Sequence, residues 1–488
     1  MFNIKNNSNK DNLGIFLFII AIAFLIITTY TGLTKIGLWY DEFYSIAFSQ
    51  LSLAEMFDLG SRDVHPLLYY LIFKAFIKIL PFLDAAVVGK IVSLIPIYLT
   101  GILAILKVKK HFGWLTAGLF FLCITSMPQL MLYSVEIRMY SWGLLFVTAS
   151  YIYLYEIIKN PNLKNWIILT VLTICSSYTH YFAAVASFGL YLILFIYLIG
   201  NNKQELKYFF ASAIVSVLSF LPWAFVVLKQ IATYNSDYWI APITLNTIVS
   251  YFYFILSPAA TFIQSNELVS PTVLGSVMLI IFIYLIYKSH NKYAIKGIIA
   301  FILVPVIGVA ISQVLHPFFH QRFMILGLGC LWLAFAVLAS ELYDENRKIF
   351  AVILCVVLLI GAVGCVNFIN IQTQDAINTQ IEYNSLNKVV GSGNVIFNDF
   401  FPTYFEMQGY LLKNNHHLCF VNDVGTNIKN ALTDPGIMGE IASGSKVYYI
   451  DGGHSNIKDV EASGLELKEI AFNQTIKNNT FKIYEIRV

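Results

Sequence analysis

The sequence predicts an α-helical membrane protein that crosses the bilayer many times and ends in a small α/β domain. Hydrophobic residues make up 58% of the 488 positions and charged residues only 12%, a composition far from that of water-soluble proteins. Apolar runs of roughly 17 to 25 residues, each long enough to span a bilayer as a helix, recur up to about residue 370. Hydrophobicity then drops abruptly. We therefore expect a transmembrane domain over 1–370 and a separate domain over 371–488.

About eleven runs qualify as spans by length and apolar character. Their approximate limits are 13–33, 85–106, 113–131, 139–158, 166–180, 182–200, 208–228, 270–287, 297–315, 322–342 and 349–370. The first run follows Lys5 and Lys10 as a signal peptide would. It is long for one, however, and no small-residue cleavage site follows it. We interpret it as a retained membrane anchor.

The loops between these spans differ in their content of lysine and arginine. One set of loops holds roughly twice as many of these residues as the other, and this bias places the N-terminus in the cytoplasm. With an odd number of spans, the C-terminus is then outside the cell membrane. The long first loop (34–84), a loop at about 229–269 and the tail (371–488) are accordingly expected on the outer side.

Two of these outer regions have a predicted structure. In the first loop, Pro66 opens a helical stretch that ends at Ile79 and carries Tyr70, Lys74 and Lys78 on one stripe, which is typical of a helix lying in the membrane interface. The tail alternates strand-like and helix-like runs, which indicates an α/β accessory domain. The strand-like runs are Asn394 to Asn398, His417 to Val421, Lys446 to Ile450 and Phe481 to Ile486, and the clearest helical run is Pro402 to Leu412.

Acidic, histidine and arginine side chains collect at the predicted outer membrane surface, although they come from distant segments. They are Asp41, Glu42, Asp63 and His65 in the first loop, Arg138 between spans three and four, His180 between spans five and six, and His320 and Arg322 before span ten. Such residues are costly at a membrane, so we expect them to form one functional site. The guanidinium group of arginine is well suited to binding phosphate, and a carboxylate can take a proton from a hydroxyl. A carboxylate together with a histidine can hold a divalent metal ion.

Other classes of function are disfavoured. The net charge of +3 and the scattered basic residues give no patch for nucleic acid. No phosphate-cradling glycine loop of the GxxxxGK[ST] type is found, and nucleotide-activated substrates are cytoplasmic. An activated donor that is used on the outer face must therefore arrive attached to a lipid.

The motifs resemble those of a known family. Leu38-Trp39-Tyr40-Asp41-Glu42, followed by Asp63-Val64-His65-Pro66, is similar to the first outer loop of GT-C membrane glycosyltransferases of family 39, the group of protein O-mannosyltransferases and aminoarabinose-lipid A transferases. Three further stretches fit: Ser134 to Ser141, Tyr178 to Tyr181, and His320 to Phe323. The resemblance covers about the first 340 residues. Leu67 replaces the second proline of the usual HPP, and Phe323 stands where relatives often have tyrosine.

The resemblance implies an inverting transferase that moves a sugar from a polyprenyl-phosphate carrier (undecaprenyl or dolichyl) to a hydroxyl of a protein, lipid or wall glycan. Asp41 would be the base or acceptor-orienting carboxylate, with Glu42 beside it, and Arg138 and Arg322 would bind the donor phosphate. Asp63, His65, Tyr140, His180, Tyr181 and His320 would line the pocket. Asp41, Asp63, His65 and His180 are candidates for a divalent metal, on which members of the superfamily differ.

Three alternatives stay open. A lipid-linked glycan polymerase or ligase would use a similar topology and donor. A transporter or flippase of lipid-linked sugars would instead place its charges near the bilayer midplane. Each residue also has a plainer interpretation, because a carboxylate outside a span is usually solvated, and arginines at span ends anchor to lipid headgroups.

Overall fold

The computed structural model describes residues 2–233, 240, 242–256, 269–289, 291–314, 317–452, 457–470, 472 and 482–487. The chain divides into two compact units. The membrane unit comprises Met1–Thr34, Leu53–Phe76 and Lys90–Asn370, and the C-terminal unit comprises Lys35–Ser52, Ile77–Gly89 and Ile371–Val488. Two stretches of the long first loop (34–84) therefore belong with the residues after 370.

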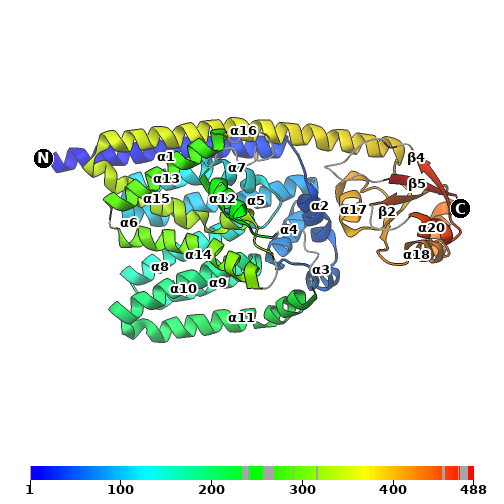
Figure 1. Cartoon of the computed structure of the whole chain (residues 1–488), viewed down its shortest axis with the longest axis horizontal. Coiled ribbons are helices and arrows are strands. Elements are labelled where there is room, and N and C mark those ends of the chain that lie inside the picture. Colours follow the sequence, from blue (N-terminus) through cyan, green and yellow to red (C-terminus); the bar gives the residue numbers. More distant parts are fainter. Residues whose placement is uncertain are drawn as a thin grey trace. The chain divides into compact units, whose positions relative to one another are not determined.

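Helices make up the membrane unit, and several continue past its boundaries (Figure 1). They are α1 (Phe2–Thr34), α3 (Leu53–Gly60), α4 (Leu68–Ile79), α5 (Ala85–Leu103), η1 (Ala104–Val108), α6 (Lys109–Ser126), α7 (Pro128–Val135), α8 (Tyr140–Lys159), α9 (Leu163–Thr179), α10 (Tyr181–Asn201), η2 (Lys203–Glu205), α11 (Leu206–Thr233), α12 (Leu245–Leu256), α13 (Val269–Lys288), α14 (Lys292–Val314), η4 (Gln321–Met324), α15 (Ile325–Glu345) and the first part of α16 (Arg347–Val389).

The predicted polytopic membrane fold is confirmed. Among the described residues, eight helices are long and apolar enough to cross a membrane, and all eleven predicted runs fall on helices. The two counts differ for three reasons. Ala85–Ser126 forms one helical run over two predicted spans, although the backbone turns at Gly113 with a φ of +82°. Helix α9 has 17 residues, and α13 qualifies only as a shorter apolar helix over Gly275–Lys288.

The core of the membrane unit is built around α15, whose apolar stretch is wholly buried. Its sequence is hydrophobic on all sides, as expected for a helix enclosed by other helices. Helices α1 and α6 approach each other at Gly14 and Gly118, where neither residue leaves room for a Cβ atom. Small residues let helix backbones come close inside a membrane, where packing drives their association.

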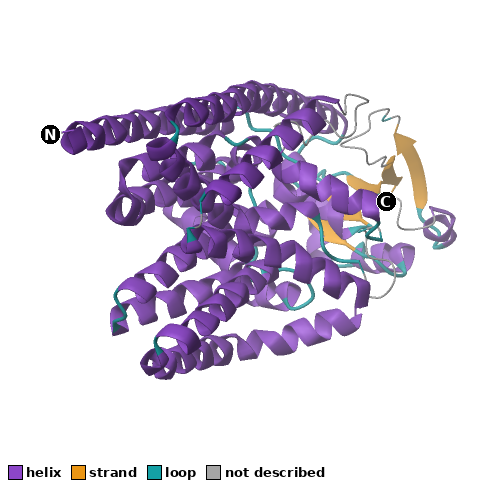
Figure 2. Cartoon of the chain, turned by 60° about the vertical axis from the view of Figure 1, so that its left-hand side comes forward, coloured by secondary structure: helices purple, strands orange, loops and turns teal. Residues whose placement is uncertain are grey.

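The C-terminal unit contains α2 (Tyr40–Gln50) and the end of α16, followed by a mixed five-stranded sheet of order β2-β1-β3-β5-β4. All strands that the structure describes lie after residue 394 (Figure 2). The strands are β1 (Val395–Asn398), β2 (His416–Cys419), β3 (Val447–Asp451), β4 (Glu466–Ile470) and β5 (Lys482–Arg487). The helical segments among them are α17 (Phe401–Glu406), the π-helical turn η5 (Met407–Leu411), α18 (Val424–Ala431), α19 (Pro435–Ala442) and α20 (Ile457–Ala462).

Strand β1 pairs in parallel with β2 and β3, with Ile396 opposite both His417 and Tyr448. Strand β5 then pairs antiparallel with both β3 and β4. The predicted α/β character of the tail is confirmed, and the four strand-like runs correspond to β1, β2, β3 and β5. Strand β4 was not predicted, because its alternating Glu466, Lys468 and Glu469 leave it largely exposed.

Candidate functional site

Arg138 lies in the short connection between α7 and α8, and its side chain is 2% exposed. Its guanidinium donates hydrogen bonds to Tyr70 Oη at 3.2 Å and to His65 Nε2 at 3.2 Å. Both partners come from the first outer loop and α4. The structure therefore brings together the Arg138 motif and the Asp63-Val64-His65-Pro66 motif, as the sequence led us to expect. Tyr70 is an addition, since the sequence marked it only as part of an interfacial stripe.

The contact with Arg138 also determines how His65 binds Asp63. Arginine is always a donor, so His65 Nε2 must be the acceptor and the proton of a neutral ring sits on Nδ1. That nitrogen lies 3.6 Å from Asp63 Oδ2. Burial raises the pKa of the Asp63 carboxyl, but His65, the Val64 amide and Arg138 together lower this pKa below its usual value. Asp63 therefore stays ionised and fixes the His65 ring.

His180 is the residue on which the site converges. It caps the N-terminus of α10: Nδ1 accepts the backbone N–H of Phe182 at 3.1 Å. Its neutral ring must then carry the proton on Nε2. The side chain is 3% exposed, and this Nε2 has no hydrogen-bond partner within the described part of the chain. A buried donor of this kind calls for an acceptor that a ligand can supply.

The electrostatic surroundings keep His180 neutral. Burial lowers the pKa of its imidazole well below the usual value, and the neighbouring His65 ring and the positive charges of Arg138 and Arg322 lower it further. The His180 and His65 rings lie 5.7 Å apart, centroid to centroid, and the Tyr140 ring lies 5.8 Å from that of His180. His180 is thus a neutral N–H donor in a region of positive potential.

Arg322 reaches this cluster from η4, just before the buried helix α15. Its side chain is 7% exposed, and the guanidinium carbon lies 6.0 Å from the centre of the Tyr140 ring. His320 caps η4 by accepting the backbone N–H of Arg322 at its Nδ1, at 3.3 Å. His320 therefore positions the arginine. The Phe323 ring contacts His180 at a centroid distance of 4.9 Å, so the aromatic ring at this position packs on the site.

Tyr181 belongs to a second layer that supports the cluster. Its hydroxyl donates to Gln230 Oε1 at 2.8 Å and accepts from Trp223 Nε1 at 3.1 Å, while Gln230 Nε2 donates to the backbone oxygen of Asp63. The sequence analysis missed Gln230 and Trp223. The signal in the sequence was a glutamine at the end of an apolar helix, because polar groups at membrane depth are usually functional. In the structure the Gln230 side chain is 5% exposed.

The acidic pair lies in the C-terminal unit, on the first turn of α2. The two carboxylates differ in their surroundings. Glu42 is 3% exposed, and its Oε2 accepts the backbone N–H of Trp39 at 3.2 Å, which stabilises the start of the helix. Asp41 is only partly buried. The geometry thus gives Glu42 a capping role, and it leaves Asp41 as the residue of the pair with solvent access.

The metal candidates differ in the lone pairs that they can offer to a cation. Within the described residues, no group of three or more His, Cys, Asp or Glu side chains is placed to hold a metal ion. His180 does not suit this role, because its Nδ1 accepts a backbone N–H and its Nε2 carries the proton, which leaves no lone pair for a cation. Asp63 and His65 retain donor types that a divalent cation takes, as does Asp41.

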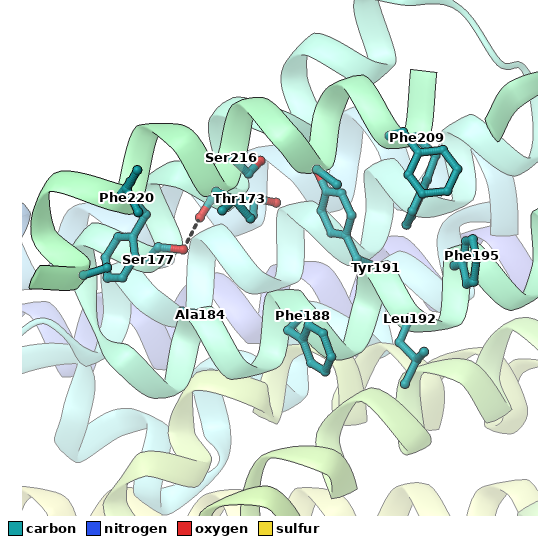
Figure 3. A pocket seen from close by; sticks show the side chains of 15 residues that line it. Thr173, Ser177, Ala184, Phe188, Tyr191, Leu192, Phe195, Phe209, Ser216 and Phe220 are labelled. Carbon is teal, nitrogen blue, oxygen red and sulfur yellow. Dashed lines mark hydrogen bonds between the residues drawn. The ribbon is translucent and has the colours of Figure 1, made fainter. Parts of the chain in front are cut away.

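An apolar groove of about 520 Å³ runs between α9, α10 and α11 (Figure 3). Phe188, Leu192 and Phe220 are among its lining side chains, and the polar atoms exposed in it are few. Ser177 and Ala184 also line the groove, and in the chain they flank the cap residue His180 on α9 and α10. The groove therefore runs along α9 and α10, the two helices that His180 connects.

No family model matches this sequence, and no curated protein matches it either. Solved structures do share its fold. The crystal structure of ArnT from Cupriavidus metallidurans bound to undecaprenyl phosphate matches with a TM-score of 0.58 at 10% identity, over 96% of this chain and 97% of ArnT. The apo structure of ArnT gives a TM-score of 0.57 at 10% identity, over 95% of this chain and 97% of ArnT. This chain therefore shares the fold of ArnT, in agreement with the fold expected from the motifs.

Proposed function

We propose that this chain is a glycosyltransferase that moves a sugar from a polyprenyl-phosphate carrier to an acceptor hydroxyl at the outer membrane face, with inversion at the anomeric carbon. One observation carries the proposal. A buried and neutral N–H donor, His180 Nε2, lies in a cluster with His65 and the positively charged Arg138 and Arg322, and an apolar groove runs along the two helices that His180 connects.

The polar end of this arrangement suits a phosphate. Guanidinium groups bind phosphate oxygens through paired N–H donors, and a desolvated N–H gains most from a charged acceptor. The Asp63 carboxylate lies beside the His65 ring. It therefore orients His65 and does not neutralise the charge of every donor in the cluster. A phosphate at lipid headgroup level would meet Arg138, Arg322 and His180 together.

The apolar end suits the hydrocarbon of the same molecule. A polyprenyl chain has no polar groups beyond its phosphate, so a groove lined by Phe188, Leu192 and Phe220 can hold it without unsatisfied hydrogen bonds. ArnT, which shares this fold, was crystallised with undecaprenyl phosphate. That likeness supports a carrier of the same chemical class for this chain.

The proposed reaction is a single displacement. The acceptor oxygen attacks the anomeric carbon as the bond from that carbon to the phosphate oxygen breaks, and polyprenyl phosphate leaves. The acceptor proton passes to the Asp41 carboxylate, a role assigned from the motif. Arg138 and Arg322 stabilise the negative charge that grows on the phosphate. Glu42 holds the helix start that carries Asp41, and Tyr140, Tyr181 and His320 position the donor-binding groups.

The test is transfer of labelled sugar from a panel of polyprenyl-phosphate donors by the full chain in liposomes. Wild type should consume one donor class, and Asp41→Asn should lower transfer by at least about 1,000-fold because the proton has no acceptor. Asp58→Asn is the matched control, since Asp58 is an exposed acid of the same outer loop that pairs with Arg62. A chelator arm tests the cation candidates Asp41, Asp63 and His65.

Two results would contradict the proposal. Labelled lipid that crosses the bilayer without donor consumption would identify a transporter. Transfer of long glycans, with no activity toward single sugars, would identify a polymerase or ligase. Full activity of Asp41→Asn would remove Asp41 as the base.

A further inference from the structure

In the C-terminal domain, α17 and η5 form the surface on which helix α2, the helix that bears Asp41, packs; we call this surface the α2 seat. Helix α2 packs on α17 and η5, and these elements lie side by side (Figure 1). The Tyr44 ring meets the Phe405 ring edge-on at a centroid distance of 4.9 Å, and the Phe43 ring lies 5.8 Å from that of Tyr410. All of these residues belong to the C-terminal unit.

The closest approach in this seat is made by a glycine in a widened turn. Segment η5 is a π-helical turn, closed by a hydrogen bond from Leu412 N to Met407 O at 2.7 Å. A Cβ atom at Gly409 would lie 3.0 Å from Ala47 Cβ and 3.2 Å from Phe43 O. The turn therefore presents bare backbone to α2, and a side chain at Gly409 would push the helix away. Such π-turns are rare and occur often at functional sites.

A second attachment lies just before α2. The backbone N–H of Leu38 donates to Thr379 Oγ1 on α16 at 3.1 Å, and Gly37 fits against Asp375 with no room for a Cβ atom. The Leu38–Gln50 segment is thus held at its start by Thr379 and along its middle by α17 and η5, all of which come after position 370. Seven residues of α2 are buried, Phe43, Ala47 and Phe48 among them.

We propose that η5 and α17 position Asp41 for the transfer reaction, so that the C-terminal domain is a positioning element rather than an accessory one. The inference rests on the proposed function, because it takes Asp41 as the base. Gly409 is the positioning residue through which η5 contacts α2. It touches neither donor nor acceptor and acts only through the placement of α2.

The experiment compares Gly409→Ala with Gly439→Ala in the full chain. Gly439 lies on helix α19 of the same domain, and a Cβ there would meet nothing within 4 Å. We expect Gly409→Ala to lower kcat about tenfold or more with KM for the polyprenyl-phosphate donor unchanged, and Gly439→Ala to change neither. Adding Ala47→Gly removes the nearest clashing atom and should restore much of the lost kcat.

Hydrogen exchange of residues 39–50 provides a readout that needs no activity. In Gly409→Ala the amides of α2 should exchange faster while those of β1 and β3 keep their protection. Unchanged exchange in α2 would show that Gly409 does not hold α2 in place. Faster exchange with full kcat would show that this contact does not position Asp41 for the reaction. A wild-type chain that transfers no sugar would instead refute the proposed function, and the exchange data would still decide whether η5 seats α2.

Discussion

Two clusters of charged side chains in the membrane unit are made from similar residues and are arranged in opposite ways. In the Glu156 cluster, Lys107 Nζ and His111 Nε2 lie 2.7 and 2.9 Å from one carboxylate oxygen of Glu156, whose side chain is 4% exposed. In the His180 cluster, by contrast, the groups that act on the buried histidine are the His65 ring and the charges of Arg138 and Arg322, and all of them disfavour its protonation.

The difference separates a structural ion-pair network from a binding site. Opposite charges at close range offset the cost of their burial, so the Glu156 cluster holds η1, α6 and α8 together. Like charges around a buried N–H donor do not stabilise the folded chain by themselves, and perturbed groups of this kind are concentrated at functional sites. The comparison predicts that changes in the His180 cluster affect ligand binding and turnover, while changes in the Glu156 cluster affect folding.

The largest expected effect is on turnover. Arg138→Gln should lower the rate of sugar transfer by about 100- to 1,000-fold, because a donor that stabilises charge on the leaving phosphate is lost. Its melting temperature in detergent should stay close to that of wild type. Arg487→Gln is the control, since Arg487 lies exposed at the end of β5. If Arg138→Gln instead melts far below wild type, Arg138 is a structural residue and the comparison fails.

The next effect is on stability. Glu156→Ala should lower the free energy of unfolding by about 3 kcal/mol, because Lys107 and His111 would lose the carboxylate between them. Thermal unfolding measures this loss, and transfer per folded molecule should be unchanged. Glu440→Ala removes an exposed partner of His416 and should cost less than about 1 kcal/mol. Equal losses in the two variants would show that the Glu156 cluster contributes little.

A smaller effect is expected on donor affinity. His180→Phe keeps an aromatic ring but removes the Nε2–H donor together with the Nδ1 acceptor that caps α10, and one hydrogen bond to a charged group is worth about 1.5–3 kcal/mol. The Kd for polyprenyl phosphate should therefore rise by roughly 10- to 100-fold. Titration calorimetry with His416→Phe as the control measures the change. An unaltered Kd would mean that His180 Nε2 does not face the phosphate.

The smallest effect is a pH dependence of stability. The pKa of His180 is lowered in the folded protein, so at pH values below the ordinary histidine pKa of about 6.5 the unfolded chain binds a proton that the folded chain does not. Stability should therefore fall as the pH drops below that value. Melting temperatures of wild type between pH 7.5 and 5 should decrease more steeply than those of His180→Gln. Parallel curves would contradict the assignment of a neutral His180.

Several features followed from the order of residues alone. Long apolar runs must form helices in a bilayer, because every backbone group has to be hydrogen-bonded there, and all eleven runs are helical. The convergence of Arg138, His65, His180 and Arg322 was also predictable in outline. Each residue ends a span on the same predicted side, so topology brings them to one level.

Other features depended on tertiary contacts. The tautomers of His65 and His180 follow from individual hydrogen bonds, which the sequence does not specify. Gln230 joins Tyr181 to the loop at Asp63, which lies 167 residues before Gln230 in the chain. No local sequence pattern predicts such a contact. The sequence places Asp41 and Glu42 side by side and does not show which of them is buried. In the structure the start of α2 buries Glu42 and leaves Asp41 partly exposed.

The hydrophobic pattern by itself determined that this protein is a polytopic membrane protein with a separate α/β tail, because the bilayer and the sheet each impose a periodicity that can be read locally. Only the tertiary structure decided that the acidic motif of the first loop belongs to the same compact unit as that tail. The physical reason is that Gly37 and Gly409 lack side chains and so permit close contact between segments more than 300 positions apart, and composition gives no sign of which glycines will make such contacts.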